Sequence, residues 1–411
     1  MLRSLAAPTL GSRWIRPVQP GPLRRLCGQP LTLHPAAAEA SPFSNIPPQI
    51  WRRVGADLHL RRDHPLGIVK RRIERFCGDW AEQRRQPRFE VFDRLDPVVS
   101  TKACFDDLLV PAAHPSRSKS DTYYVDEHRV LRTHTSAHQT GLIGGGVRAF
   151  LCSGDVYRRD EIDATHFPVF HQMEGVRMYD EKDFPAGISA AEAKRRVEHD
   201  LKELLTGLAR HLFGDVECRW REDYFPFTEP SFELEVRFGA DWLEVLGCGV
   251  IHDQVLRNAF HAESGGLRVG WAFGLGLERL AMVLFGIPDI RLFWSTDERF
   301  LSQFRGCGDE IRRFVPYSKY PLCYKDVSFW LPEPAEAFHR NNVFEVIRSV
   351  AGDLVERVRL FDEFTNKQGR VSQAYRIDYR HFDRSLTNEE VDEIQSRVRT
   401  ALVETLGVQL R

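Results

Sequence analysis

The sequence predicts an α+β fold in two units: a larger one built on a mixed, mostly antiparallel sheet and a smaller C-terminal one. Three observations predict it. Between residues 150 and 250, apolar alternation marks strands joined by long connections. The regular strand and helix alternation that a doubly wound parallel sheet requires is missing. After residue 317, the order strand, helix, strand, strand, helix is typical of a ferredoxin-like unit.

The composition is that of a folded chain with an unusual beginning. Its 411 residues include 42% apolar and 28% charged side chains, enough for two or three ordinary cores. Residues 1–38 hold five arginines and no acidic residue, which is typical of a mitochondrial transit peptide; a disordered basic tail is the alternative. Without those five arginines, the rest of the chain has 52 of the 57 basic residues and all 58 acidic ones, so its net charge is negative. It is therefore not a basic nucleic-acid binder overall.

Membrane spans, disulfides and structural zinc are not expected. No run of about eighteen apolar residues occurs, so we expect no contact with a membrane. Eight cysteines are scattered without a Cys-x-x-Cys pair, which argues against a zinc site or a disulfide framework and fits a reducing compartment.

A long helix that begins near His64 is the first expected element. Its apolar residues recur at intervals of three and four, as on one buried face of a helix: Leu66, Val69, Ile73, Phe76 and Trp80. Residues 89–99 follow as a strand that ends in Asp-Pro-Val-Val. Taken alone, the helix is an ordinary core helix.

The larger sheet follows. Residues 150–156 and 167–170 are expected as strands around a loop, and residues 186–213 as a helix. Residues 231–250 alternate as two strands about a Gly-Ala-Asp turn. The string Gly-Leu-Gly of residues 274–276 is expected to form a hairpin turn before an apolar helical run, which would hold Arg279 rigidly at the start of that helix.

Residues 317–411 are expected to fold as a separate unit after a junction bracketed by Pro316 and Pro321. The expected strands are residues 327–331, 355–364 and 372–379, and the expected helices are residues 342–352 and 387–406. Thr387 and Glu390 have the spacing of a capping box at the last helix. In the last strand, Arg376, Asp378 and Arg380 share one face, which is either a binding surface or an ordinary solvated face.

Two arginines are the strongest indication of chemistry. Arg158 follows the strand of residues 150–156 in the string Tyr-Arg-Arg-Asp, and Arg279 begins the helix after the glycine string. A guanidinium presents a planar fork that binds phosphate oxygens bidentately. One guanidinium from each element could clamp opposite ends of a triphosphate. The glycine string is neither a Walker A loop nor a dinucleotide fingerprint.

These stretches resemble the motifs of class II aminoacyl-tRNA synthetases. Residues 157–160 with Phe-His-Gln-Met-Glu-Gly at 170–175 resemble motif 2, residues 274–280 resemble motif 3, and the helix and strand of residues 64–99 resemble motif 1. Four further stretches resemble the phenylalanyl-tRNA synthetase family: HTSAHQ at 134–139, FPFTEPS at 225–231, EVLGCG at 244–249 and GWAFG at 270–274. The resemblance covers residues 45–411 and, with the N-terminal segment, is to the mitochondrial single-chain form.

The resemblance implies four parts and one activity. The parts would be a transit peptide (1–38), a class II catalytic domain (39–300), a linker (301–316) and a ferredoxin-fold anticodon-binding domain (317–411). The activity would be ATP-dependent ligation of phenylalanine to mitochondrial tRNA(Phe) through phenylalanyl-adenylate, with the terminal 2′-hydroxyl as acceptor. ATP with Mg²⁺, a mitochondrial matrix location and a monomeric state are implied as well.

The resemblance also implies residue roles. Arg158 and Arg279 would be catalytic, Arg158 at the α-phosphate and Arg279 on the adenine face opposite Phe170 with its charge near the γ-phosphate. The other ATP-binding residues would be Asp160, Thr165, His166, Phe167 and Glu244, with Glu244 holding magnesium or the ribose. The phenylalanine site would comprise His134, Ser136, Ala137, His138, Gln139, Gln172, Met173, Glu174, Phe225, Phe227, Ala272 and Phe273. Arg376 and Arg380 would contact tRNA.

Several alternatives remain open. His166 could be a loop histidine with a local partner, Glu244 could form a strand salt bridge, and Phe225 and Phe227 could be ordinary core. Asp160 stands where the class usually has Glu, and Ala113 where the family usually has Asp, which puts their local contacts in doubt. Two rival functions are a biotin-ligase-like adenylate-forming enzyme, which would not need the C-terminal unit, and a non-catalytic RNA-binding paralogue, which should have lost one of the two arginines.

Overall fold

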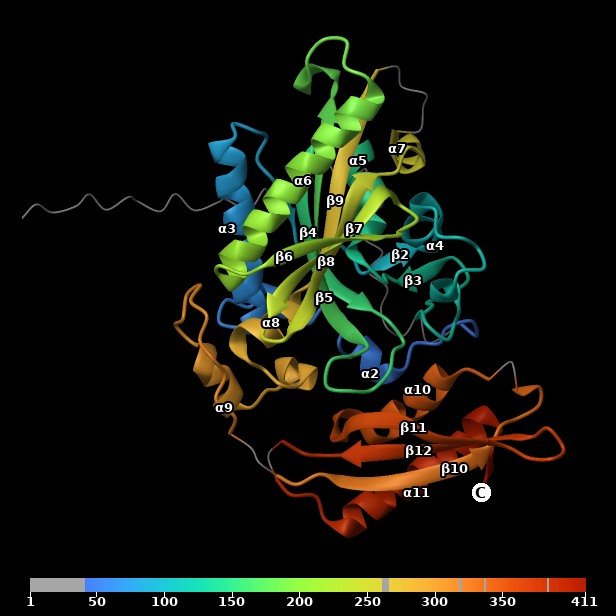
Figure 1. The fold of residues 1–411 in the computed structure, drawn as a ribbon. Coiled ribbons are helices and arrows are strands. Elements are labelled where there is room, and N and C mark those ends of the chain that lie inside the picture. The colour runs from blue at the N-terminus through green and yellow to red at the C-terminus, as the bar shows by residue number, and fades with distance from the viewer. Residues whose placement is uncertain (1–40, 261–265, 318–319, 336–337, 383) are drawn as a thin grey trace, which may run out of the picture.

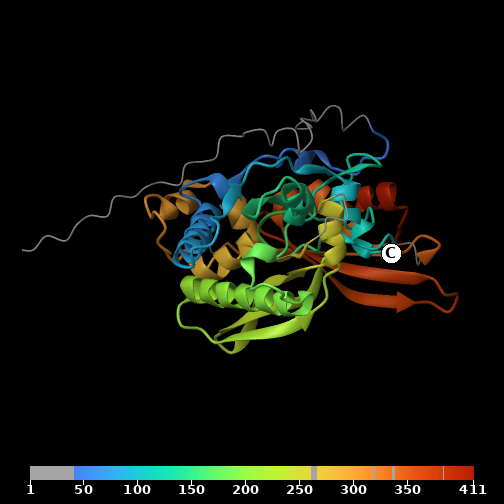
Figure 2. The same ribbon diagram turned by 90° about the horizontal axis from the view of Figure 1, so that it is seen from above.

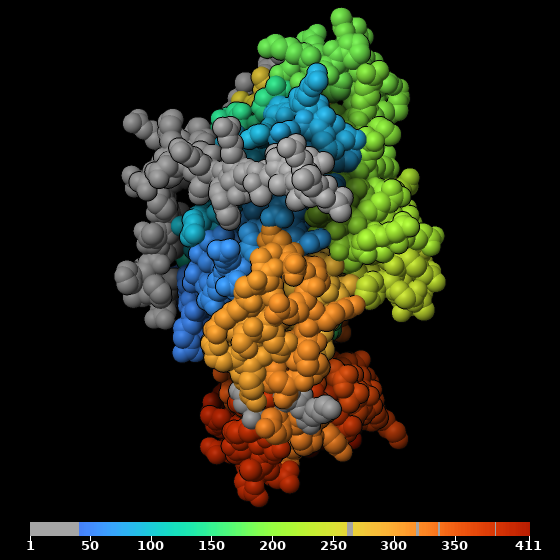
Figure 3. Space-filling model, turned by 90° about the vertical axis from the view of Figure 1, so that its left-hand side faces the viewer, coloured from blue at the N-terminus to red at the C-terminus, as the bar shows by residue number. Residues whose placement is uncertain are grey.

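Two packed units make up the described part of this computed structural model, residues 41–260, 266–317, 320–335, 338–382 and 384–411. The expected transit segment, residues 1–38, lies outside them. Figure 1 shows the larger unit above the smaller one. Figure 3, a view from the side, shows the smaller unit (red) at one end of the molecule, next to an orange segment of the larger unit around residue 300.

A seven-stranded sheet of order β1-β4-β5-β9-β8-β7-β6 forms the centre of the larger unit. Its strands are β1 (Glu90–Phe92), β4 (Ala149–Tyr157), β5 (Val169–Asp180), β6 (Cys218–Asp223), β7 (Thr228–Phe238), β8 (Asp241–Ile251) and β9 (Arg268–Gly276). Only β1 pairs in parallel, with β4, and the other neighbouring pairs are antiparallel. The predicted mixed, mostly antiparallel sheet is confirmed.

Helices cover both faces of this sheet. The longer ones, α3 (Pro65–Gln83), α6 (Ala190–Phe213) and α8 (Leu277–Phe285), pack on one face around the buried Trp271. The shorter α5 (Gln139–Gly144) and α7 (Asp253–Phe260) pack on the other face. In Figure 2, α6 (green) runs along the side of the sheet. The apolar period that predicted α3 therefore marks the face that packs toward the sheet.

Short elements complete the larger unit. They are α2 (Pro48–Trp51), α4 (Thr101–Cys104), α9 (Glu298–Leu301) and a two-stranded sheet of β2 (Val98–Ser100) and β3 (Arg129–Leu131). The 3₁₀ turns are η2 (Leu58–Leu60), η3 (Asp106–Leu108), η4 (Pro115–Arg117), η5 (Thr135–His138), η6 (Glu181–Asp183), η7 (Ile290–Trp294) and η8 (Ser302–Phe304). No helix among the described residues combines the length and the apolar character needed to cross a membrane.

Two local predictions were wrong. Residues 89–99 form not one strand but β1 and β2, which lie in different sheets. Between them the carbonyls of Asp93 and Leu95 accept hydrogen bonds from the side chains of His59 and Arg132, and Pro97 has no N–H for a sheet ladder. The string Gly-Leu-Gly of residues 274–276 is not a hairpin turn, because it is the end of β9 and pairs with β5 up to Gly276. Helix α8 still begins directly after it.

The smaller unit has a four-stranded sheet of order β11-β12-β10-β13. Its elements are β10 (Cys323–Trp330), α10 (Arg340–Ala351), η10 (Gly352–Leu354), β11 (Val355–Thr365), β12 (Val371–Tyr379), α11 (Asn388–Leu406) and β13 (Gln409–Leu410), the last of which was not expected. Tyr375, Ile377 and Tyr379 of β12 point into a core with both helices. The capping box of Thr387 and Glu390 is present.

The two units meet at the loop between β4 and β5. Asn341 of α10 donates from its amide to the carbonyl of Arg159 (3.0 Å), and Arg348 of the same helix donates to the carbonyl of Asp160 (2.8 Å). Ile162 of the loop is buried in the core of the smaller unit. The loop after Arg158 is therefore held by side chains that lie more than 180 positions further along the chain.

Candidate active site

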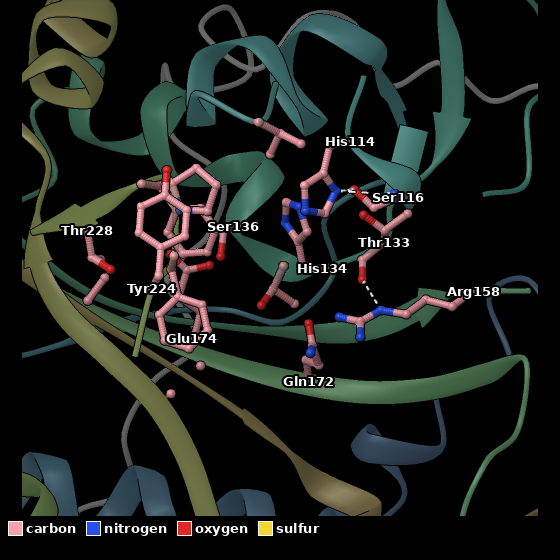
Figure 4. A pocket seen from close by; sticks show the side chains of 18 of the residues that line it. His114, Ser116, Thr133, His134, Ser136, Arg158, Gln172, Glu174, Tyr224 and Thr228 are labelled. Atoms are coloured by element: carbon pink, nitrogen blue, oxygen red, sulfur yellow. Dashed lines mark hydrogen bonds between the residues drawn. The ribbon is translucent and has the colours of Figure 1, made fainter. Parts of the chain in front are cut away.

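A cavity of about 550 Å³ opens on the central strands of the larger unit. Figure 4 shows side chains from β5, the η5 turn and the loop before β7 pointing into it. Eleven of the expected site residues line its wall: His134, Ser136, Arg158, Asp160, Gln172, Glu174, Phe225, Phe227, Glu244, Ala272 and Phe273. Segments that are far apart in the sequence thus form one site.

One end of the cavity is an aromatic slot. The rings of Phe225 and Phe227 are nearly parallel, with centroids 6.0 Å apart and planes 15° apart. A Cβ atom at Gly247 would lie 2.7 Å from the Phe225 ring, so a glycine on β8 makes room for this ring. Phe273 and Ala272 of β9 also line the wall. A flat apolar group can pack against this pair of rings, which are too close together to admit another ring between them. Ring contacts of this kind contribute about 0.5–1.5 kcal/mol each beyond burial.

Glu174 supplies a buried carboxyl near this slot (Figure 4). Its side chain is 1% exposed, and within the described residues neither carboxyl oxygen has a hydrogen-bond partner that meets ordinary geometry. Burial raises its pKa to about 8, although the Ser136 and Thr135 hydroxyls beside it act in the opposite direction. A buried carboxyl without a partner is costly, so the site favours a cation at this position.

Arg158 lies at the other end of the cavity. Its Nε donates a hydrogen bond to the carbonyl oxygen of Thr133 (2.9 Å), and its guanidinium carbon is 5.2 Å from the centre of the Phe170 ring. In Figure 4 the guanidinium points into the cavity, toward Gln172. Burial of His134 and the charge of Arg158 lower the pKa of His134 to about 3, so this imidazole is neutral. The positive charge here belongs to Arg158.

Arg279 and Glu244 form an ion pair at the rim. Nη1 of Arg279 donates to Oε2 of Glu244 across 2.9 Å, and the two side chains are 51% and 46% exposed. Glu244 lines the cavity together with Glu233, whose pKa is raised by burial and by the charge of Glu244. Arg279 is not part of the wall. Phe170, which was expected to face Arg279 across an adenine, lies beside the guanidinium of Arg158.

The remaining expected residues lie away from the cavity wall. Met173 is fully buried in the core on the other face, because β5 turns Gln172 and Glu174 toward the cavity and Met173 away from it. Phe167 packs in the same core, Ala137 packs in the core of the opposite face, and Gln139 is 1% exposed. His138 is bound by Arg132. Thr165 and His166 bond to Asp163, which raises the pKa of His166.

Several wall residues were not expected. Tyr224, the residue before the Phe-Pro-Phe string, lines the mouth with a side chain that is 75% exposed. Arg159 lies between Arg158 and Asp160, which were identified, so neighbourhood in sequence was a usable signal for it. Glu233 has no identified site residue beside it. No sequence neighbour indicated Asn341, because it reaches the wall only through the packing of the smaller unit against the larger one.

The outer face of the smaller sheet carries Arg376 in an aromatic setting. Its guanidinium lies over the rings of Tyr324 (4.4 Å) and Phe361 (5.3 Å), which are 56% and 51% exposed, and it forms a bidentate ion pair with Asp326. Asp378, which shares this face, is not solvated: it is 1% exposed and paired with Arg357. Arg380 shares Glu356 with Arg291 of the larger unit and so lies where the units meet.

Comparisons with known proteins agree with this arrangement. Residues 57–304 match the family model of the tRNA synthetases class II core domain (F), and residues 318–411 match that of the ferredoxin-fold anticodon binding domain. The chain is similar to the chloroplastic/mitochondrial phenylalanine–tRNA ligase of Arabidopsis thaliana, at 54% identity over 91% of this chain and 84% of that one. It is also similar to the mitochondrial phenylalanine–tRNA ligases of Mus musculus (48% identity; 90% and 86% covered) and Saccharomyces cerevisiae (40%; 90% and 92%).

Proposed function

Because the chain belongs to the class II aminoacyl-tRNA synthetases, as a phenylalanine–tRNA ligase of the mitochondrial type, we propose how its residues carry out the reaction of that family. The enzyme uses ATP to charge tRNA(Phe) with phenylalanine for translation in the mitochondrial matrix. The catalytic core and the anticodon-binding domain are in one chain, which supports a monomer as the working unit.

One observation carries the residue assignments: a single cavity holds an unpartnered carboxyl beside an aromatic slot at one end and a guanidinium at the other. The phenyl ring of the substrate would enter the slot of Phe225 and Phe227. Its ammonium would lie at Glu174, where it replaces the proton that keeps this carboxyl neutral. Gln172 and Ser136 of the same wall would bind the remaining polar atoms of the amino acid.

Arg158 would then act on the α-phosphate of ATP. Negative charge grows there as the phenylalanine carboxylate attacks phosphorus and pyrophosphate leaves. A guanidinium already held by Thr133 and Phe170 stabilises that charge without reorganisation, and so stabilises the transition state more than the ground state. The products are phenylalanyl-adenylate and pyrophosphate, and the adenylate is the donor to tRNA.

Magnesium would be bound at the rim. Among the described residues, no group of three or more His, Cys, Asp or Glu is placed to hold a metal ion by itself. Two wall carboxylates, Glu233 and Glu244, repel each other. A pair of carboxylates suits Mg²⁺, because one or two carboxylates commonly hold this ion together with substrate phosphates. The ion would neutralise phosphate charge, and Arg279 would be released from Glu244 to contact the nucleotide.

The outer face of the smaller sheet would bind the anticodon region. Exposed aromatic rings stack on bases, and an arginine beside them adds charge for the phosphates. Tyr324, Phe361 and Arg376 supply both on neighbouring strands. Arg380 is a weaker candidate, because it lies where the two units meet and shares Glu356 there with Arg291.

Phenylalanine-dependent exchange between pyrophosphate and ATP tests this account, with and without tRNA(Phe). We expect exchange without tRNA, and its loss when Arg158 is replaced by alanine. Exchange that requires a different amino acid, or that needs none, would contradict the assignment of the cavity.

A further inference from the structure

Arg132 is a fully buried arginine that does not line the cavity. It lies directly after β3 and is 1% exposed. Its Nε donates to the carbonyl of Asp155 (2.7 Å), and its Nη2 donates to Oδ1 of the same residue (2.9 Å). The other carboxyl oxygen of Asp155 accepts from the hydroxyl of Tyr157 and from the backbone N–H of Gly55. Both oxygens of this buried carboxylate thus accept hydrogen bonds, which is the condition under which a buried ion pair is tolerated.

The third nitrogen of the same guanidinium contacts the η5 turn. Nη1 of Arg132 lies 2.9 Å from Nε2 of His138 and 3.3 Å from the carbonyl oxygen of Leu95. Arginine only donates, so Nε2 of His138 must accept, and the imidazole is neutral with its proton on Nδ1. Burial and the charge of Arg132 both lower the pKa of His138. His138 ends the turn that carries Ser136.

Backbone carbonyls of residues 132 and 133 also bind the end of β4 and Arg158. The N–H of Tyr157 donates to the carbonyl of Arg132 (2.9 Å), and Nε of Arg158 donates to the carbonyl of the next residue, Thr133 (2.9 Å). A Cβ atom at Gly154 would lie 2.0 Å from Nη2 of Arg132, so the strand can lie this close to the guanidinium only because it has glycine there. Both ends of the cavity are therefore connected through residues 132 and 133.

We propose that Arg132 is a positioning residue for amino-acid activation: it sets the end of β4 so that Arg158 meets the α-phosphate, and it sets the η5 turn that carries Ser136. The proposal rests on the function proposed above. Displacement of a reacting group by about 1 Å can cost on the order of a hundredfold in rate. Lysine would keep the charge of Arg132 but not the fork that reaches Asp155, His138 and Leu95 together.

A double-mutant cycle of Arg132→Lys and Arg158→Ala tests the proposal on kcat for pyrophosphate exchange. We expect Arg132→Lys to lower kcat by at least about tenfold in the parent enzyme and by less than about twofold when Arg158 is already alanine, because its effect on the chemical step acts through Arg158. Its effect through Ser136 should instead raise KM for phenylalanine in both backgrounds. An equal loss in both backgrounds would overturn the proposal, since it would show a general structural role. If Arg158→Ala alone has no effect, the proposed function fails instead.

Arg177 offers a matched control. It is a second arginine with 1% exposure, on β5, where it packs over the ring of Phe89 (4.4 Å). Arg177→Lys should lower the melting temperature as Arg132→Lys does and leave kcat per folded enzyme within about twofold of the parent. An equal loss of kcat in both lysine variants would contradict the proposal. If Arg132→Lys does not fold, Asp155→Asn replaces it in the cycle, with the same outcomes expected.

Discussion

Nε of Arg158 donates a hydrogen bond to the carbonyl oxygen of Thr133 across 2.9 Å, which leaves the far end of the guanidinium to face the cavity. The charge that the reaction needs is therefore oriented by the backbone of a neighbouring segment. The same segment leads into the η5 turn and the amino-acid end of the cavity. In the proposed mechanism, residues 132–136 therefore help to orient both substrates.

Removal of either proposed phosphate contact should impair activation. We expect Arg158→Ala and Arg279→Ala each to lower kcat/KM for pyrophosphate exchange by at least about a hundredfold, because one preorganised charge donor contributes on that scale. Arg195→Ala is the control, since Arg195 is 68% exposed on α6 and pairs with Glu192. A variant of Arg158 or Arg279 that stays within a few-fold of the parent has been given the wrong role.

Phenylalanine binding should depend on pH through Glu174. Its pKa of about 8 means that the carboxyl of the unliganded site is mostly protonated below pH 8, whereas the bound ammonium favours the ionised form. Binding then releases a proton, so KM for phenylalanine should fall by up to about tenfold per unit as pH rises from 6 toward 8, and should level off above 8. The KM for ATP, measured in the same assays, is the internal control.

Replacement of Glu174 by glutamine removes both the proton and the charge. We expect Glu174→Gln to raise KM for phenylalanine by about ten- to a hundredfold, the range for losing one charge-assisted hydrogen bond, and to abolish the pH slope between 6 and 8. A variant that keeps the slope of the parent would show that another group titrates.

Much of this fold follows from local patterns. The period of three and four predicted α3, the alternation of β7 and β8 predicted their turn, and the capping box predicted α11. Met173 was expected in the phenylalanine site, but the alternation of β5 places it on the face opposite to Gln172 and Glu174. The break between β1 and β2 and the position of Asn341 depend on side chains distant in sequence, and no local pattern carries them.

Substitutions on the outer face of the smaller sheet should weaken tRNA binding and leave amino-acid activation unchanged. We expect Arg376→Ala to raise KM for tRNA(Phe) by roughly five- to fiftyfold and to leave pyrophosphate exchange unchanged, because base stacking and cation–π contacts contribute about 1–3 kcal/mol. Arg397→Ala, an exposed arginine of α11 behind the sheet, is the matched control. Equal charging by both variants would remove this face from the tRNA interface.

Tyrosine should be a detectable wrong substrate. A pocket for a bare ring rejects an added hydroxyl by only about a hundredfold. The two family matches, residues 57–304 and 318–411, account for nearly the whole chain between residues 57 and 411 and leave no space there for an editing domain. We expect slow tyrosylation of tRNA(Phe) and no hydrolysis of preformed tyrosyl-tRNA(Phe). Deacylation above the spontaneous rate would reveal an editing site.

The most direct test of the central claim is a crystal structure of the enzyme with a non-hydrolysable phenylalanyl-adenylate analogue. One cavity should hold the whole analogue, with its ring packed against Phe225 and Phe227, its ammonium about 3 Å from the carboxyl of Glu174, and its phosphate analogue within hydrogen-bond distance of Arg158. An ammonium bound elsewhere, or a phosphate position that Arg158 does not contact, would contradict the account.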